Sequence, residues 1–168
     1  MKRDREPVCE VRMNIHRKRS NSQMERGQSL VELALSFTVL LILLSGIVDL
    51  GRAFFTFMAL RDAAQEGAVY GSLFPCDPAV ANCGALNITG IVNRVKAASS
   101  SPVDMNNPGI TIIPTLIGTG LCHGNGIRVE VQWNNFPMIM PFWQTLMGSN
   151  TIPIRARIED TILVPPCH

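Results

Sequence analysis

The residues at the start of the longest apolar stretch are the ones whose types and spacing suggest chemistry. The segment RGQSLVE (residues 26–32) sets a glycine ahead of four residues and a glutamate. A carboxylate at the middle of a bilayer costs about 2.5–3.5 kcal/mol, and less near the interface, so Glu32 needs a partner. Cleavage after Gly27 would create one, because the new α-amino group of Gln28 is a cation at neutral pH. We expect Glu32 of a neighbouring subunit to neutralise that amine.

The stretch that follows is long enough to cross one bilayer. Residues 33–48 are 16 positions without a charge. Residues 30–50 supply the roughly 20 helical residues that a core of about 30 Å requires, with Glu32 and Asp49 near the two interfaces. No proline interrupts residues 28–71, so the sequence predicts one helix of about 60 Å that begins just after the glycine.

The second half of this helix is expected to lie against a folded domain. Charged residues there alternate with apolar ones, and the apolar stripe ends in small side chains that allow another element to approach closely. Gly71 and Pro75 are expected to end the helix. The predicted stripe consists of Ala53, Phe57, Leu60, Ala64, Ala68 and Gly71.

Charge divides at the same place as hydropathy. Residues 1–27 hold eight of the 15 basic and four of the 13 acidic residues, which gives +4, while residues 28–168 carry −2. A basic segment directly before a span is typical of a cytoplasmic end, so residues 1–27 are expected to be a cytoplasmic leader that is cleaved off. Its residues 1–26 are polar and without apolar periodicity, so we expect them to carry no fold. The folded part offers no basic face, and we expect no nucleic-acid partner.

Cysteine placement agrees with this orientation. Cys9 precedes the span, and four cysteines follow it: Cys76, Cys83, Cys122 and Cys167. Four cysteines on the oxidising side of a membrane suggest two disulfides, for which three connectivities exist. Loop length favours Cys76 with Cys83, which would leave Cys122 with Cys167.

Zinc is the alternative use of these thiols, because Cys122-His123 and Cys167-His168 offer two pairs of suitable ligands. Adjacent side chains on an extended segment point to opposite faces, so both members of a pair rarely reach one ion. We therefore expect disulfides and no metal. The sequence contains no HExxH, GxSxG or glycine-rich phosphate loop, so we also expect no catalytic residues, no cofactor and no enzyme.

Residues 72–168 are predicted to form a small α+β domain outside the cytoplasm. Residues 87–98 have the spacing of a short amphipathic helix with Asn87 as its cap. Alternation predicts strands over 110–117, 127–133 and 152–158, and Pro153 indicates either that the last is an edge strand or that a strand starts there. With one polar face each, these strands would form an antiparallel sheet whose apolar face the helices cover.

Residues 136–147 (FPMIMPFWQTLM) form an unusual apolar run within this domain. Its two prolines predict a loop. Burial under the sheet is the default for such a run. Exposure would instead make it a surface that binds a partner or contacts the membrane.

Three segments resemble a known family: RGQSLVELAL (26–35), DLGRAFF (49–55) and LRDAAQEGAVYG (60–71). The first is similar to the processing site of type IV prepilins, and together they resemble the TadE family of the tight adherence (Flp pilus) assembly system. The resemblance implies that a membrane aspartyl prepilin peptidase cuts after Gly27, that Gln28 becomes the N-terminus, and that Glu32 is the family's glutamate. The 27-residue leader departs from the family pattern, which makes Met13 or Met24 an alternative start.

The resemblance implies a pilin-like protein, a minor pilin or pseudopilin, that takes part in building a Tad/Flp type IV pilus. Its partners would be the peptidase, other pilin-like subunits and the assembly platform. It would be a single-pass protein of the cytoplasmic membrane, with its N-terminus inside and residues 72–168 outside. The alternatives are an unprocessed anchor that displays a binding module and a cleaved secretory signal.

Overall fold

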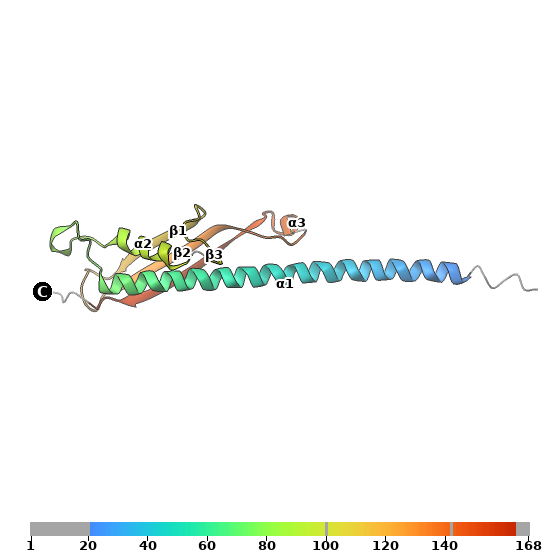
Figure 1. Cartoon of the computed structure of the whole chain (residues 1–168), viewed down its shortest axis with the longest axis horizontal. Coiled ribbons are helices and arrows are strands. Elements are labelled where there is room, and N and C mark those ends of the chain that lie inside the picture. Colours follow the sequence, from blue (N-terminus) through green and yellow to red (C-terminus); the bar gives the residue numbers. More distant parts are fainter. Residues whose placement is uncertain (1–20, 100, 142, 164–168) are drawn as a thin grey trace, which may run out of the picture. The chain divides into compact units, whose positions relative to one another are not determined.

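The structure is a computed structural model that describes residues 21–99, 101–141 and 143–163, with the backbone alone for residues 21–26, 81 and 146. It divides into two compact units, Met1–Leu41 and Ile42–His168. The expected α+β fold is confirmed, with one long helix followed by a small sheet and short helices (Figure 1). The elements in chain order are α1 (Asn21–Leu73), the 3-10 turn η1 (Ala81–Cys83), α2 (Ile88–Ala98), β1 (Ile110–Ile117), β2 (Gly126–Pro137), α3 (Trp143–Met147) and β3 (Thr151–Thr161).

Helix α1 extends past the predicted range at both ends. It begins at Asn21, so the prediction that residues up to 26 carry no fold is wrong for the last six of them. The sequence QME at residues 23–25 consists of good helix formers, and the single Gly27 costs only about 1 kcal/mol, so no residue there stops the helix. The part of the leader over residues 1–20 lies outside the described residues. At the other end α1 reaches Leu73, two residues before Pro75.

The sheet has three antiparallel strands in the order β1-β2-β3, with β2 in the centre. Strand β1 has the predicted bounds and pairs along its whole length with β2, from Ile110 opposite Trp133 to Ile117 opposite Gly126. Strand β3 is an edge strand, one of the two alternatives that Pro153 indicated. Strand β2 continues beyond its predicted end through a register shift between Trp133 and Phe136, so Phe136 still pairs with β3.

The core lies between one face of this sheet and the two helices α1 and α2. Alternate residues of β2 face it, and α2 contributes Ile91 and Val95. Asn87 caps α2 as predicted, because its side chain accepts a hydrogen bond from the Gly90 N–H at 3.0 Å. The helices cover the apolar face of the sheet, as the alternation indicated.

Small residues of α1 permit this packing. A Cβ added at Gly71 would lie 3.0 Å from Ile91 Cδ1, and one added at Gly67 would overlap Val95 Cγ2. The predicted stripe is correct for Leu60, Ala64, Ala68 and Gly71 but wrong for Phe57, which is 38% exposed. Thr56 is buried at that level instead, because neighbouring residues lie about 100° apart around a helix and Thr56 shares the face of Leu60.

Candidate functional site

The predicted processing segment lies within α1, and all three of its named residues are exposed. Gly27, Gln28 and Glu32 follow six residues that are already helical, so the prediction that the helix begins just after the glycine is wrong. A protease needs an extended backbone, so cleavage here would require the first turns of α1 to unwind. Gly27 lowers that cost, since glycine is about 1 kcal/mol less favourable than alanine inside a helix.

The surroundings of Gly27 give no structural reason for a glycine. A Cβ added to it would meet no atom within 4 Å among the described residues, and its φ is not in the left-handed region. Gln28 and Glu32 lie one helical turn apart, about 6 Å along the axis, on the same side of the helix. The structure therefore presents a glutamate close to the end that a cut after Gly27 would create.

The surface around this segment is apolar and exposed. The described residues contain one helix, Gly27–Leu73, that is long and apolar enough to cross a membrane, and nothing in its most apolar window is buried. The side chains from Leu30 to Leu50 would therefore expose a long hydrophobic surface to water. A core helix of a soluble protein would bury such a surface, so a lipid environment explains it better.

Asp49 forms a second polar site on α1 that sequence reasoning did not foresee. We expected it near a membrane interface, and the structure shows that its side chain is buried within the protein, with 1% of it exposed. Its Oδ2 accepts hydrogen bonds from the backbone N–H groups of Ile139 and Met140, at 2.7 and 2.6 Å. Its Oδ1 lies 3.0 Å from Arg52 Nη1. This carboxylate is thus fully enclosed by donors and carries a nearby counter-charge.

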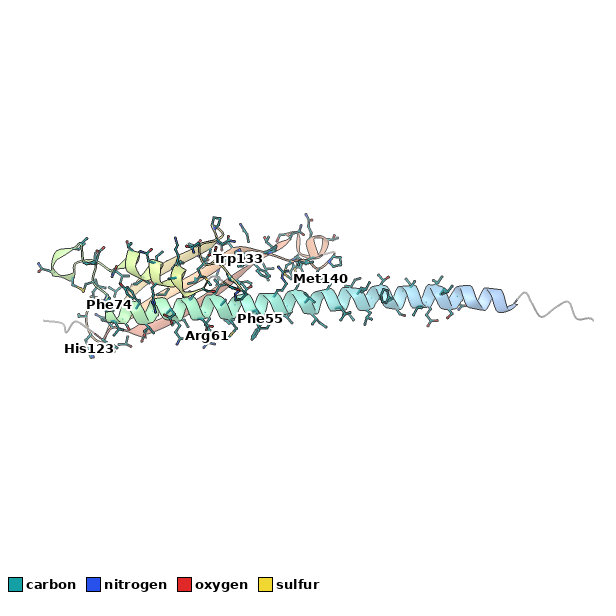
Figure 2. The ribbon with its side chains drawn as sticks, viewed as in Figure 1. Phe55, Arg61, Phe74, His123, Trp133 and Met140 are labelled. Carbon is teal, nitrogen blue, oxygen red and sulfur yellow. A yellow bond between two sulfur atoms is a disulfide. The ribbon has the colours of Figure 1, made fainter. Side chains whose placement is uncertain are left out.

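Through this carboxylate the apolar run of residues 136–147 is held against α1. The Arg52 guanidinium carbon lies 5.3 Å from the centroid of the Phe136 ring, a cation–π distance. Figure 2 shows Met140 beside α1, where its sulfur would lie 3.5 Å from a Cβ added at Gly46. The run is a loop only in part, because Phe136 and Pro137 end β2 and Trp143–Met147 form α3. Phe136 is buried, whereas Ile139 and Met147 are exposed, so the expected burial under the sheet is correct only for part of the run. The sequence signal was an acid directly after the apolar stretch with an arginine three residues later.

The cysteines follow the prediction where the structure describes them. Cys76 and Cys83 form a disulfide across the turn that contains η1. Cys122 is also disulfide-bonded, which removes its thiolate as a zinc ligand. Cys167 and His168 lie outside the described residues, so the pairing of Cys122 with Cys167 stays a prediction. Within the described ranges no three His, Cys, Asp or Glu side chains gather where they could hold a metal ion.

Together the long exposed apolar helix and the small α+β domain fit a single-pass membrane protein. Within that class, the family model described as TadE-like protein matches residues 27–69. The match confirms the resemblance over this segment, which is most of α1 and includes Gly27, Gln28, Glu32 and Asp49. Neither a curated protein nor a solved structure matches the chain.

Proposed function

We propose that this chain is a processed, pilin-like subunit, a minor pilin or pseudopilin, that takes part in assembly of a Tad/Flp type IV pilus. The TadE-like match over residues 27–69 supports involvement in Tad pilus assembly. The long apolar helix with a small domain at its C-terminal end is consistent with such a subunit. Its role would be structural rather than enzymatic.

The observation that carries the proposal is the segment from Gly27 to Glu32. It combines a glycine that packing does not require with an exposed carboxylate five residues later at the start of an exposed apolar helix. A plain signal anchor would need neither feature, and the carboxylate would make insertion less favourable. Both features have a use if a prepilin peptidase cuts after Gly27 and Glu32 then pairs with the Gln28 amine of another subunit.

Orientation follows from charge. The leader carries +4 over residues 1–27, so the positive-inside rule places it in the cytoplasm and the domain outside, with α1 in the cytoplasmic membrane. The Cys76–Cys83 disulfide is consistent with an oxidising compartment for the domain. The proposed partners are the membrane aspartyl peptidase, other pilin-like subunits and the pilus assembly platform.

The test is the mature N-terminus of the chain expressed with its cognate prepilin peptidase. Intact mass of the membrane-extracted protein should show loss of residues 1–27 and a start at Gln28. Gly27→Ala and the bulkier Gly27→Leu should block the cut while the helix persists, because the space around Gly27 is open. Gly51→Ala is the matched control, since it makes the same change in open space on the same helix and should be cut normally.

Two results would contradict the proposal. A membrane-extracted protein that keeps residues 1–27 in the presence of active peptidase would favour the unprocessed anchor with a binding module. A start beyond Val48 would identify a cleaved secretory signal.

A further inference from the structure

We propose that the β2–β3 loop, residues 138–150, is a second membrane contact that enters the outer leaflet of the bilayer that α1 crosses. This inference rests on the proposed span of α1. It assigns lipid, rather than water or another protein, as the surroundings of the loop in the membrane-bound chain.

The position of the loop along α1 is the first reason. Its backbone N–H groups at Ile139 and Met140 donate to Asp49, and the Met140 sulfur lies next to Gly46. Gly46 belongs to the uncharged stretch of residues 33–48. The loop is therefore held at the level of α1 where the apolar stretch ends, which is the level of the outer interface.

The surface of α1 at this level is the second reason. Its exposed apolar side chains do not stop at Asp49, because Leu50, Phe54 and Phe55 are exposed as well. Of the two charged residues among them, Asp49 is buried, and Arg52, whose side chain is 37% exposed, is paired with it. A headgroup region that covers α1 from Asp49 as far as Phe55 would also cover the loop, which contacts α1 at Gly46 and Asp49.

The composition of the loop is the third reason. Residues 131–154 contain no Asp, Glu, Lys, Arg or His, so the loop can enter lipid without carrying a charge into it. Ile139 is 64% exposed and Met147 is 60% exposed. Trp143 lies between them in sequence, at the start of α3; it is half-buried, and its indole N–H is buried without a hydrogen-bond partner among the described residues. Tryptophan is enriched where a membrane meets water.

Backbone hydrogen bonding is the fourth reason, because irregular backbone at membrane depth must find its partners within the protein. The Met138 N–H donates to Asn150 O at 2.9 Å, and the Gly148 N–H donates to Gln144 O at 2.8 Å. The N–H groups of the two residues between Met138 and Pro141 donate to the Asp49 carboxylate. In water, solvent could accept the hydrogen bonds of these two N–H groups, and burial of a carboxylate for that purpose would cost desolvation free energy without need.

The experiment uses tryptophan fluorescence of the full chain in vesicles of phosphatidylcholine and phosphatidylglycerol, with and without bromine on the acyl chains. The chain has two tryptophans, so Trp133→Phe leaves Trp143 as the reporter. Two reference chains lack both native tryptophans and carry one elsewhere. Phe37→Trp reports on the proposed span, and Phe74→Trp reports on a site about 37 Å beyond Asp49 along the helix direction.

We expect bromolipid to lower the emission of Trp143 and of the Phe37→Trp chain about twofold, and to leave the Phe74→Trp chain unchanged. Quenching of the Phe37→Trp chain without quenching of Trp143 would overturn the membrane contact while leaving the span intact. An unquenched Phe37→Trp chain would overturn the span and this inference with it. Trp143 shielded from bromolipid but crosslinked to a second copy would assign the loop to a subunit interface instead.

Discussion

Glu32 and Asp49 are carboxylates on the same helix at the two ends of one apolar stretch, yet their surroundings differ. Glu32 is exposed on the helix surface, whereas Asp49 is enclosed by two backbone N–H donors and Arg52. An enclosed carboxylate with all its donors in place fixes local structure. An exposed one beside lipid still needs a partner, which only another molecule or a new chain end can supply. The contacts of Asp49 are those of a residue that stabilises the fold, and in the proposed subunit we expect Glu32 to act in assembly instead.

The role of Asp49 predicts a stability effect. Asp49→Ala leaves the Ile139 and Met140 N–H groups buried without an acceptor and Arg52 without its counter-charge. Loss of one partner of a buried polar group costs about 1–3 kcal/mol, and more where a charge is involved, so we expect the domain to lose roughly 2–4 kcal/mol. This loss of stability can be measured by guanidinium unfolding in detergent, with near-ultraviolet circular dichroism as the signal that monitors unfolding.

The matched control for Asp49 is Asp62→Ala, which removes an exposed acid from the same helix. Surface substitutions of this kind stay within about 0.5 kcal/mol. Equal unfolding midpoints for the two variants would show that the Asp49 contacts add nothing to stability, and that the loop is held by other means.

At the scale of elements, the glycines of α1 have different surroundings along its length. A Cβ at Gly67 would overlap Val95 of α2 and would lie 3.5 Å from Val129 Cγ1 of β2, while one at Gly51 would meet no atom within 4 Å. Alanine favours the helix by about 1 kcal/mol at either place. Packing therefore decides whether Gly67→Ala raises or lowers the stability of the domain, whereas helix propensity decides it for Gly51→Ala.

We predict that Gly67→Ala destabilises the domain by about 1–3 kcal/mol, the usual cost of overpacking a core. Gly51→Ala should be neutral or stabilise the chain by up to about 1 kcal/mol. Thermal unfolding of both variants in the same detergent separates them, because the two changes are chemically identical. A Gly67→Ala protein as stable as the parent would mean that α1 and α2 can separate slightly without cost.

The sequence predicted the elements whose pattern is local. Alternation along Ile127–Trp133 and the helical spacing with its cap at Asn87 depend on neighbouring residues alone. Helix α2 formed where expected, and β2 includes the whole predicted strand but continues to Pro137. The short loop between Cys76 and Cys83 likewise made their pairing predictable. The helix start at Asn21 was missed because polar residues gave no apolar period, although they are good helix formers.

What the sequence could not give depends on contacts between distant segments. The burial of Asp49 requires the N–H groups of residues 139 and 140, some 90 positions away. The exposure of Phe57 depends on which face of α1 the sheet covers, and a shift of one residue turns that face by about 100°. Helix α3 is only five residues long, which is too short to show a period.

For the whole molecule, the proposed cut changes how charge is distributed along the chain. The leader carries +4 and the remaining residues carry −2. A strongly basic end holds a span in its orientation, and it also resists leaving the membrane through the apolar core. After the cut, the new end of α1 would carry one amine in place of that leader. A subunit of this kind could leave the bilayer for a fibre once that amine is neutralised.

Neutralisation by Glu32 gives the last prediction, which is a selective loss of assembly in Glu32→Ala and Glu32→Gln. In a single chain the change removes an exposed polar group from an apolar helix, so insertion, membrane level and cleavage after Gly27 should persist. Between packed helices, removal of one partner of a buried charge pair costs about 3–5 kcal/mol, because the Gln28 amine stays unpaired. Recovery of pili or crosslinked complexes should therefore fall in both variants and stay normal in Asp62→Ala, the exposed acid further along α1. Full assembly with both Glu32→Gln and Glu32→Ala would mean that the carboxylate of Glu32 only reaches water at the interface and does not pair with the Gln28 amine.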